Sequence, residues 1–140
     1  MPKVYLTRRE RFSSAHRLFR PDYSDEKNLE VFGLCSNPSW HGHNYELFVT
    51  VKGEINPEFG YVVNLKDISS LMKELVISKL DHKNINVDVD FMKGKIASTE
   101  NLAIAIWKEL ELPVKKVGGE LYCVKIQETE NNYFEYFGEE

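Results

Sequence analysis

The sequence lacks any long hydrophobic run. Its first nine residues, Met1 to Arg9, already include three basic side chains, whereas a secretory signal needs a continuous apolar stretch and a membrane-spanning helix a longer one. We therefore expect a cytoplasmic location. Cysteine is also scarce, with two residues in 140. Because thiols stay reduced in that compartment, Cys35 and Cys123 are not expected to form a disulfide, and each needs its own explanation.

An excess of positive charge is missing as well. The formal net charge is -4, so the chain offers nucleic-acid phosphates no general attraction. Basic side chains do cluster locally, at Arg8 to Arg11 and at Arg17 and Arg20. Such clusters could bind a small polyanion, but a solvated surface is the commoner explanation.

The chain length and the balance of 42% apolar and 29% charged residues favour one globular domain over residues 1–140.

Apolar residues that alternate with polar ones predict strands towards both ends of the chain. The first two strands are expected at residues 3–16 and 43–53, separated by a long loop rich in turn formers. A third strand opens after Gly118-Gly119, and a fourth follows a turn and covers residues 133–137. In the third strand one face is expected to carry Tyr122, Val124, Ile126 and Glu128, while Cys123, on the other face, is interpreted as a small core residue.

Apolar residues at helical spacing predict two helices in the middle of the chain. The first follows Asn64 and extends to Leu80, and the second is capped by Ser98 or Thr99 and stops before Pro113. The order ββααββ indicates an α+β fold. Two hairpins leave the edges of a small sheet unpaired, so we expect the subunits to assemble into a larger closed sheet.

Three of the four histidines are candidate metal ligands. His41 and His43 flank Gly42 at the start of a strand, where a period of two places both imidazoles on one side. His-x-His alone is more often a coincidental surface pair. His16 ends the preceding strand, and hairpin pairing could bring it beside the other two. Three neutral imidazoles with an open fourth position are typical of catalytic zinc.

Cys35 precedes His41 by six residues and lies in the predicted loop. It could be a further metal ligand, a catalytic base or an inert thiol. A thiol beside a cation ionises readily and can then accept a proton.

Asp81 and His82 directly follow the first predicted helix. Asp81 could be a helix cap and His82 a surface residue. Alternatively, the His82 imidazole could carry protons while the Asp81 carboxylate orients it.

Glu128 ends an otherwise apolar strand face. Either it is a surface acid at a strand end, or its carboxylate binds the paired N–H groups of a guanidine-like heterocycle edge.

Together these motifs resemble the 6-pyruvoyl-tetrahydropterin synthase family. The resemblance covers most of the chain from Phe12 to Gly138, and its motifs occur in the family order: Phe12 to Leu18, Cys35 to Tyr45, Gly60 to Leu65, Leu80 to Asn84, Thr99 to Asn101, and Glu128-Thr129. It implies zinc ligands at His16, His41 and His43, a catalytic group of Cys35, Asp81 and His82, and a pterin anchor at Glu128.

The resemblance also implies a fold, an assembly and a reaction. The fold would be the T-fold, whose ββααββ subunits join their sheets into a barrel, commonly in a hexamer built as a dimer of trimers. The substrate would be 7,8-dihydroneopterin triphosphate, converted to 6-pyruvoyl-tetrahydropterin with loss of triphosphate on the route to tetrahydrobiopterin, and Zn²⁺ would be the only cofactor.

Two alternatives remain at this point. The related 6-carboxy-tetrahydropterin synthases of deazapurine biosynthesis share the zinc histidines and the Asp-His pair, but they typically have three residues between the cysteine and His-Gly-His, whereas five separate Cys35 from His41 here. The other alternative is a non-catalytic module that binds zinc or pterin, in which Cys35 and His82 have no role in a reaction.

Overall fold

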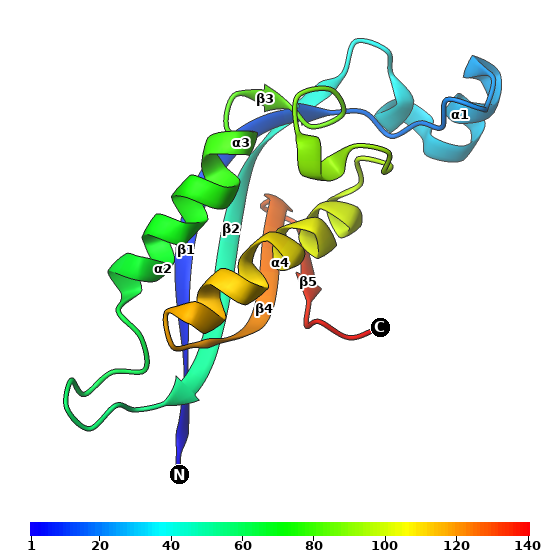
Figure 1. Ribbon diagram of the computed structural model, residues 1–140. Helices are drawn as coiled ribbons and strands as arrows, with labels where there is room; N and C mark the ends of the chain where they lie inside the picture. The colour runs from blue at the N-terminus through cyan, green and yellow to red at the C-terminus, as the bar shows by residue number, and fades with distance from the viewer.

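One five-stranded sheet, with helices packed on one of its faces, makes up the computed structural model, which describes residues 1–140. The strands lie in the order β3-β1-β2-β4-β5. Their bounds are Lys3–His16 for β1, His41–Glu54 for β2, Lys83–Asn84 for β3, Glu120–Thr129 for β4 and Asn132–Tyr136 for β5. Figure 1 shows the helices α2 (Leu65–Met72) and α4 (Thr99–Lys116) lying along the same face. The opposite face carries no helix.

Strands β1 and β2 form one long antiparallel hairpin, paired from Lys3 opposite Glu54 to His16 opposite His41. Alternation along β2 sends every second side chain into the core beneath the helices, as the sequence predicts. These buried residues are Tyr45, Leu47, Val49 and Val51. The pairing extends two residues further towards the N-terminus than predicted, so β2 begins at His41 and includes the whole His-Gly-His motif.

The first predicted helix is confirmed, but it is not uniform. Helix α2 begins after Asn64, whose side chain accepts a hydrogen bond from the backbone N–H of Lys66. It continues through a π-helical turn, Lys73–Ile77, into the short helix α3, Ser78–Leu80. Apolar residues keep facing the sheet along the whole length, because Ile68, Met72, Val76 and Leu80 are all buried.

The prediction that the second helix stops before Pro113 is wrong. Ser98 caps α4 by accepting from the Asn101 N–H, but the helix runs through Pro113 to Lys116. Proline removes one backbone donor and crowds the preceding turn. Here Leu110 and Val114 on either side of it are buried in the core, and this packing keeps the last turn helical.

The predicted loop between the first two strands contains a helix that sequence patterning missed. Helix α1, Asp25–Phe32, is capped by Ser24, and a 3-10 segment, Gly33–Ser36, follows it. Helix α1 has no continuous apolar stripe, because Leu29 and Val31 are exposed. Its buried residue is Asn28, whose side chain accepts from the Arg20 N–H and donates to the Arg20 carbonyl.

Strand β4 contains a bulge that changes which side chains face the helices. Val49 pairs with Val124 and Val51 with Leu121, so β4 has one residue more than β2 in this stretch. The extra residue is Tyr122, whose ring contacts Tyr5 with centroids 4.8 Å apart on the uncovered face. The expectation that Tyr122 shares a face with Val124 is therefore wrong.

Cys123 is buried, as predicted, but it lies opposite Thr50 on the uncovered side of the sheet and outside the main apolar cluster. Burial raises the pKa of its thiol.

None of the helices combines the length and the hydrophobicity needed to span a bilayer.

Candidate functional site

The end of the β1–β2 hairpin brings three histidines together. His16 and His41 are directly opposite each other in the strand register, and His43 lies two residues further along β2. The ring centroid of His16 is 4.4 Å from that of His41 and 5.2 Å from that of His43. The centroids of His41 and His43 are 5.1 Å apart. One ligand atom from each ring lies within 4.8 Å of the other two.

The hydrogen bonding of this cluster fits a metal ion. His16 Nδ1 lies 2.8 Å from the carbonyl of Ala97, which accepts hydrogen bonds only, so Nδ1 carries the proton and Nε2 has a free lone pair. The Nε2 atoms of His16 and His43 are buried without a partner. Burial lowers the pKa of both His16 and His41, which keeps these rings neutral, as metal ligation requires.

Glu128 belongs to the same site and is not a surface acid at a strand end. Its Oε1 atom lies 3.8 Å from His43 Nε2, and its Oε2 atom accepts a hydrogen bond from the hydroxyl of Thr99. Thr99 is buried at the start of α4. The carboxylate is thus held between the histidine cluster and the first turn of α4, with 18% of its side chain exposed.

Sequence reasoning missed Tyr45, which continues the row of His41 and His43 along the same face of β2. Its ring centroid is 5.5 Å from that of His43 and 6.1 Å from that of His16. Its hydroxyl is buried and has no hydrogen-bond partner. Burial raises the pKa of this phenol, so the hydroxyl stays protonated. The two-residue period of the strand was the signal that could have found it.

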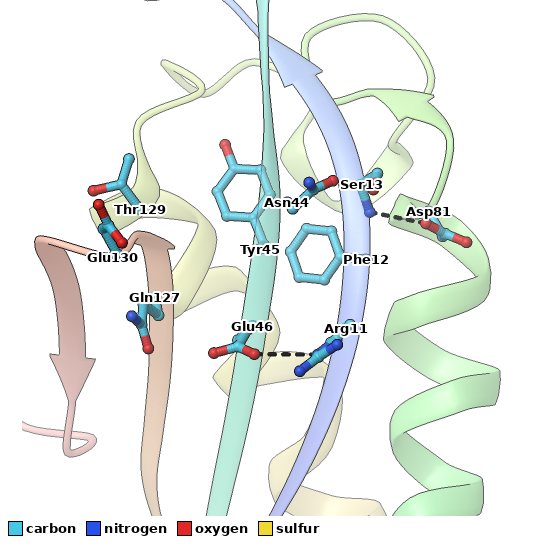
Figure 2. Close-up of a pocket in the computed structure, with 10 residues that line it drawn as sticks. All are labelled: Arg11, Phe12, Ser13, Asn44, Tyr45, Glu46, Asp81, Gln127, Thr129 and Glu130. Carbon is cyan, nitrogen blue, oxygen red and sulfur yellow. Dashed lines mark hydrogen bonds and ion pairs between the residues drawn. The ribbon is translucent and has the colours of Figure 1, made fainter.

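Asp81 and His82 pair with each other at the outer edge of β1. The Asp81 carboxylate lies 3.0 Å from His82 Nδ1 and accepts from the Ser13 N–H at 2.8 Å (Figure 2). That N–H holds the pKa of Asp81 below its usual value of 3.8. His82 has a φ of 61°, and its own N–H donates to the Ser13 carbonyl at 2.7 Å. Its imidazole is 83% exposed.

Cys35 is exposed in the 3-10 segment after α1. Its carbonyl accepts from the Leu18 N–H at 2.8 Å, which ties the segment to the residues that follow His16. The thiol itself makes no hydrogen bond. Within one chain the structure therefore brings the three histidines to Glu128 and brings Asp81 to His82, whereas the thiol is not a member of the histidine cluster and forms no hydrogen bond to either group.

Two open hollows lie over this part of the sheet. One, of about 560 Å³, is lined by both His43 and His82. The other, of about 440 Å³, extends across β1, β2 and β4 from Asp81 to Glu130 (Figure 2). In that view Tyr45 lies beside Phe12, and its hydroxyl points along β2 towards the histidine end of the hairpin. The first hollow thus reaches the histidine cluster at His43, while Asp81 is the proposed catalytic residue that lines the second.

Known proteins resemble this chain over nearly its whole length. The model of the 6-pyruvoyl tetrahydropterin synthase family matches residues 5–139. The chain belongs to this family. The human protein named 6-pyruvoyl tetrahydrobiopterin synthase is 48% identical over 139 residues, covering 98% of this chain and 93% of the human one. The 6-carboxy-5,6,7,8-tetrahydropterin synthase of Bacillus subtilis is 30% identical, covering 76% of this chain and 73% of its own.

A solved member of the family has the same fold. The 6-pyruvoyl tetrahydropterin synthase of Caenorhabditis elegans superposes with a TM-score of 0.89 at 40% identity, covering 99% of this chain and 98% of that one. The α+β T-fold expected for the subunit is therefore confirmed, and the chain is an enzyme of the pyruvoyl type.

Proposed function

We propose that this protein is a zinc-dependent cytoplasmic enzyme that converts 7,8-dihydroneopterin triphosphate to 6-pyruvoyl-tetrahydropterin and releases triphosphate. The observation that carries the proposal is the cluster of His16, His41 and His43, with its buried, unpartnered Nε2 atoms beside the Glu128 carboxylate. Three nitrogen ligands leave a coordination position for substrate oxygen. Zinc bound there would polarise the side-chain oxygens of the substrate as a Lewis acid.

The residues around the cluster have complementary roles in this proposal. Glu128 accepts the two adjacent N–H groups of the 2-amino-4-oxo pterin ring, which form a donor pair like that of a guanidinium group. This contact fixes the ring and places its side chain towards the histidines. The Cys35 thiolate removes a proton from the side-chain carbon, and His82, oriented by Asp81, carries protons between side chain and ring.

The decisive experiment is to incubate the zinc-loaded protein with dihydroneopterin triphosphate and to identify the products by mass. The proposal expects inorganic triphosphate together with 6-pyruvoyl-tetrahydropterin. Formation of 6-carboxy-tetrahydropterin and acetaldehyde would instead assign the activity of the deazapurine relatives. Binding of zinc and substrate without any product would favour the non-catalytic module.

We further propose that the active unit is a homo-oligomer, a hexamer formed by two trimers. Two features of the single chain support this. First, β3 pairs only with Ser14 and Ala15 of β1, so the N-terminal part of β1 and the outer side of β5 are sheet edges that can pair with a neighbour. Second, within one subunit the Cys35 thiol is not a member of the histidine cluster and forms no hydrogen bond to the Asp81–His82 pair. A neighbouring subunit could supply the missing group.

Mixed oligomers test whether sites are shared. We expect Cys35→Ala and His82→Ala to be inactive separately and to regain activity when they are co-expressed with different tags and purified as mixed assemblies. If each site takes Cys35 from one subunit and His82 from another, random mixing leaves about a quarter of the sites intact. Mixed oligomers that stay as inactive as the parents would show that one subunit supplies both groups.

A further inference from the structure

The segment that carries Cys35 is held in place by hydrogen bonds and not by apolar packing. This segment, the Cys35 turn, is the short 3-10 helix Gly33–Ser36, in which Leu34 is 85% exposed and Cys35 is exposed as well. No side chain of the turn belongs to the apolar core. The position of the thiol therefore depends on the polar contacts that join the turn to the rest of the chain.

Two of these contacts come from the residues that directly follow His16. The Leu18 N–H donates to the Cys35 carbonyl at 2.8 Å, and the side chain of Arg17 donates from Nε to the Ser36 carbonyl at 2.7 Å. Ser36 is buried, so its carbonyl needs a donor from the protein. A guanidinium group supplies a charge-assisted hydrogen bond, which is stronger than a neutral one.

Arg17 is itself fixed on two sides. Its backbone N–H donates to the side-chain oxygen of Asn86, and the amide nitrogen of Asn86 donates to the Arg17 carbonyl, each at 2.9 Å. The guanidinium carbon lies 4.0 Å from the centroid of the Phe19 ring, which is a cation–π contact. Arg17 thus joins the end of β1, the loop after β3 and the Cys35 turn.

We infer that Arg17 is a positioning residue for Cys35, because its guanidinium group fixes the backbone from which the thiol projects. This inference rests on the proposed function, in which the Cys35 thiolate removes a proton from the substrate. All of the contacts lie within one chain, so they hold the thiol in the same way whichever subunit's histidines it faces. A catalytic group that moves by about 1 Å can lose about 100-fold in rate, so loss of the Arg17 contact should slow the chemical step.

Two substitutions of Arg17 test the inference in the zinc-loaded protein. Arg17→Met keeps an unbranched side chain but has no N–H donor. We expect it to lower kcat for triphosphate release about 10- to 100-fold, with little change in KM or zinc content. Arg17→Gln places an amide nitrogen as many bonds from the backbone as Nε, so it should recover most of that loss. If Arg17 instead bound the substrate triphosphate, KM would rise in both variants, and the inference would be wrong.

The matched control is Arg20→Met. Arg20 also places its guanidinium group over an aromatic ring, that of Tyr23 at 4.6 Å, but it donates to Asp22 and not to the Cys35 turn. We expect this variant to keep the wild-type kcat. Amide hydrogen exchange adds a readout that needs no turnover. The Leu18 N–H should exchange about tenfold faster in Arg17→Met and at the wild-type rate in Arg20→Met.

A double-mutant cycle identifies the group through which Arg17 acts. If Arg17 serves to hold the thiol, Arg17→Met should cause no further loss of the residual rate once Cys35→Ala has removed the thiol. A further loss of the same size in the double variant would show that Arg17 acts on another group, and the inference would have to be abandoned.

Failure of the inference and failure of the proposed function give different results. If the wild-type protein releases no triphosphate, the proposed function is wrong. If the wild-type protein is active and Arg17→Met keeps the full kcat, the inference is wrong and the proposed function stands. If Arg17→Met does not fold, Arg17→Gln decides: a rate near that of the wild type with unchanged KM supports the inference, and a raised KM overturns it.

Discussion

Replacing Cys35 by alanine is expected to reduce triphosphate release by about 10²–10⁴-fold, the contribution typical of a positioned acid or base. The thiol is exposed and forms no hydrogen bond, so its removal should cost little stability. Zinc content and pterin affinity should remain at the wild-type level, because Cys35 is not a member of the histidine cluster and forms no hydrogen bond to Glu128. The measurement is the initial rate of triphosphate release at saturating substrate, together with metal analysis and a pterin titration.

Cys123→Ala is the matched control for this prediction. It makes the same chemical change at the other cysteine, which is buried on the uncovered side of the sheet and far in sequence from every proposed catalytic residue. We expect this variant to keep its turnover, although loss of a buried sulfur will lower its stability. Turnover that survives in Cys35→Ala would exclude the thiol as the base.

Replacing His43 by alanine is expected to remove the metal and, with it, the activity. Only two imidazoles would then remain, and the loss of zinc affinity should exceed about 100-fold, since even groups that merely orient a ligand contribute 10- to 100-fold. His43 is the better choice for substitution than His16, because His16 is 3% exposed and bonded to Ala97, so its removal would also disturb the core. Zinc per chain is measured after dialysis against a weak chelator.

His82→Ala is the control that separates metal binding from proton transfer. Its side chain is 83% exposed and bonded to Asp81, so this variant should retain zinc fully and lose turnover. If His43→Ala kept a full equivalent of zinc, the three-histidine site would have to be abandoned. If His82→Ala lost zinc, His82 would have to be assigned to the metal.

Most of the site could be predicted from local pattern. A strand period of two places His41, His43 and Tyr45 on one face whatever the rest of the fold does, and hairpin pairing follows from two long adjacent strands. Helix α1 and the continuation of α4 through Pro113 could not be predicted, because both depend on packing. A buried asparagine anchors α1, and two buried aliphatic residues outweigh the cost of the proline.

The bulge in β4 is another feature that local pattern could not predict. Strict alternation placed Tyr122 on the same face as Val124 and Ile126, but one extra residue in β4 moves it to the other face. Glu128 lies beyond the bulge and keeps the face that alternation from Val124 and Ile126 predicts. The error therefore affected the strand and left the site intact.

By itself the sequence determined the three-histidine set, the Asp81–His82 pair and the α+β class, because these depend on short-range periods that the backbone imposes. Only the tertiary structure decided which groups meet. It placed Glu128 next to His43, brought Thr99 from another element to the carboxylate, left the Tyr45 hydroxyl buried without a partner and left the Cys35 thiol outside the histidine cluster. Those contacts join residues tens of positions apart in the chain, and their distances follow from how the sheet and α4 pack together.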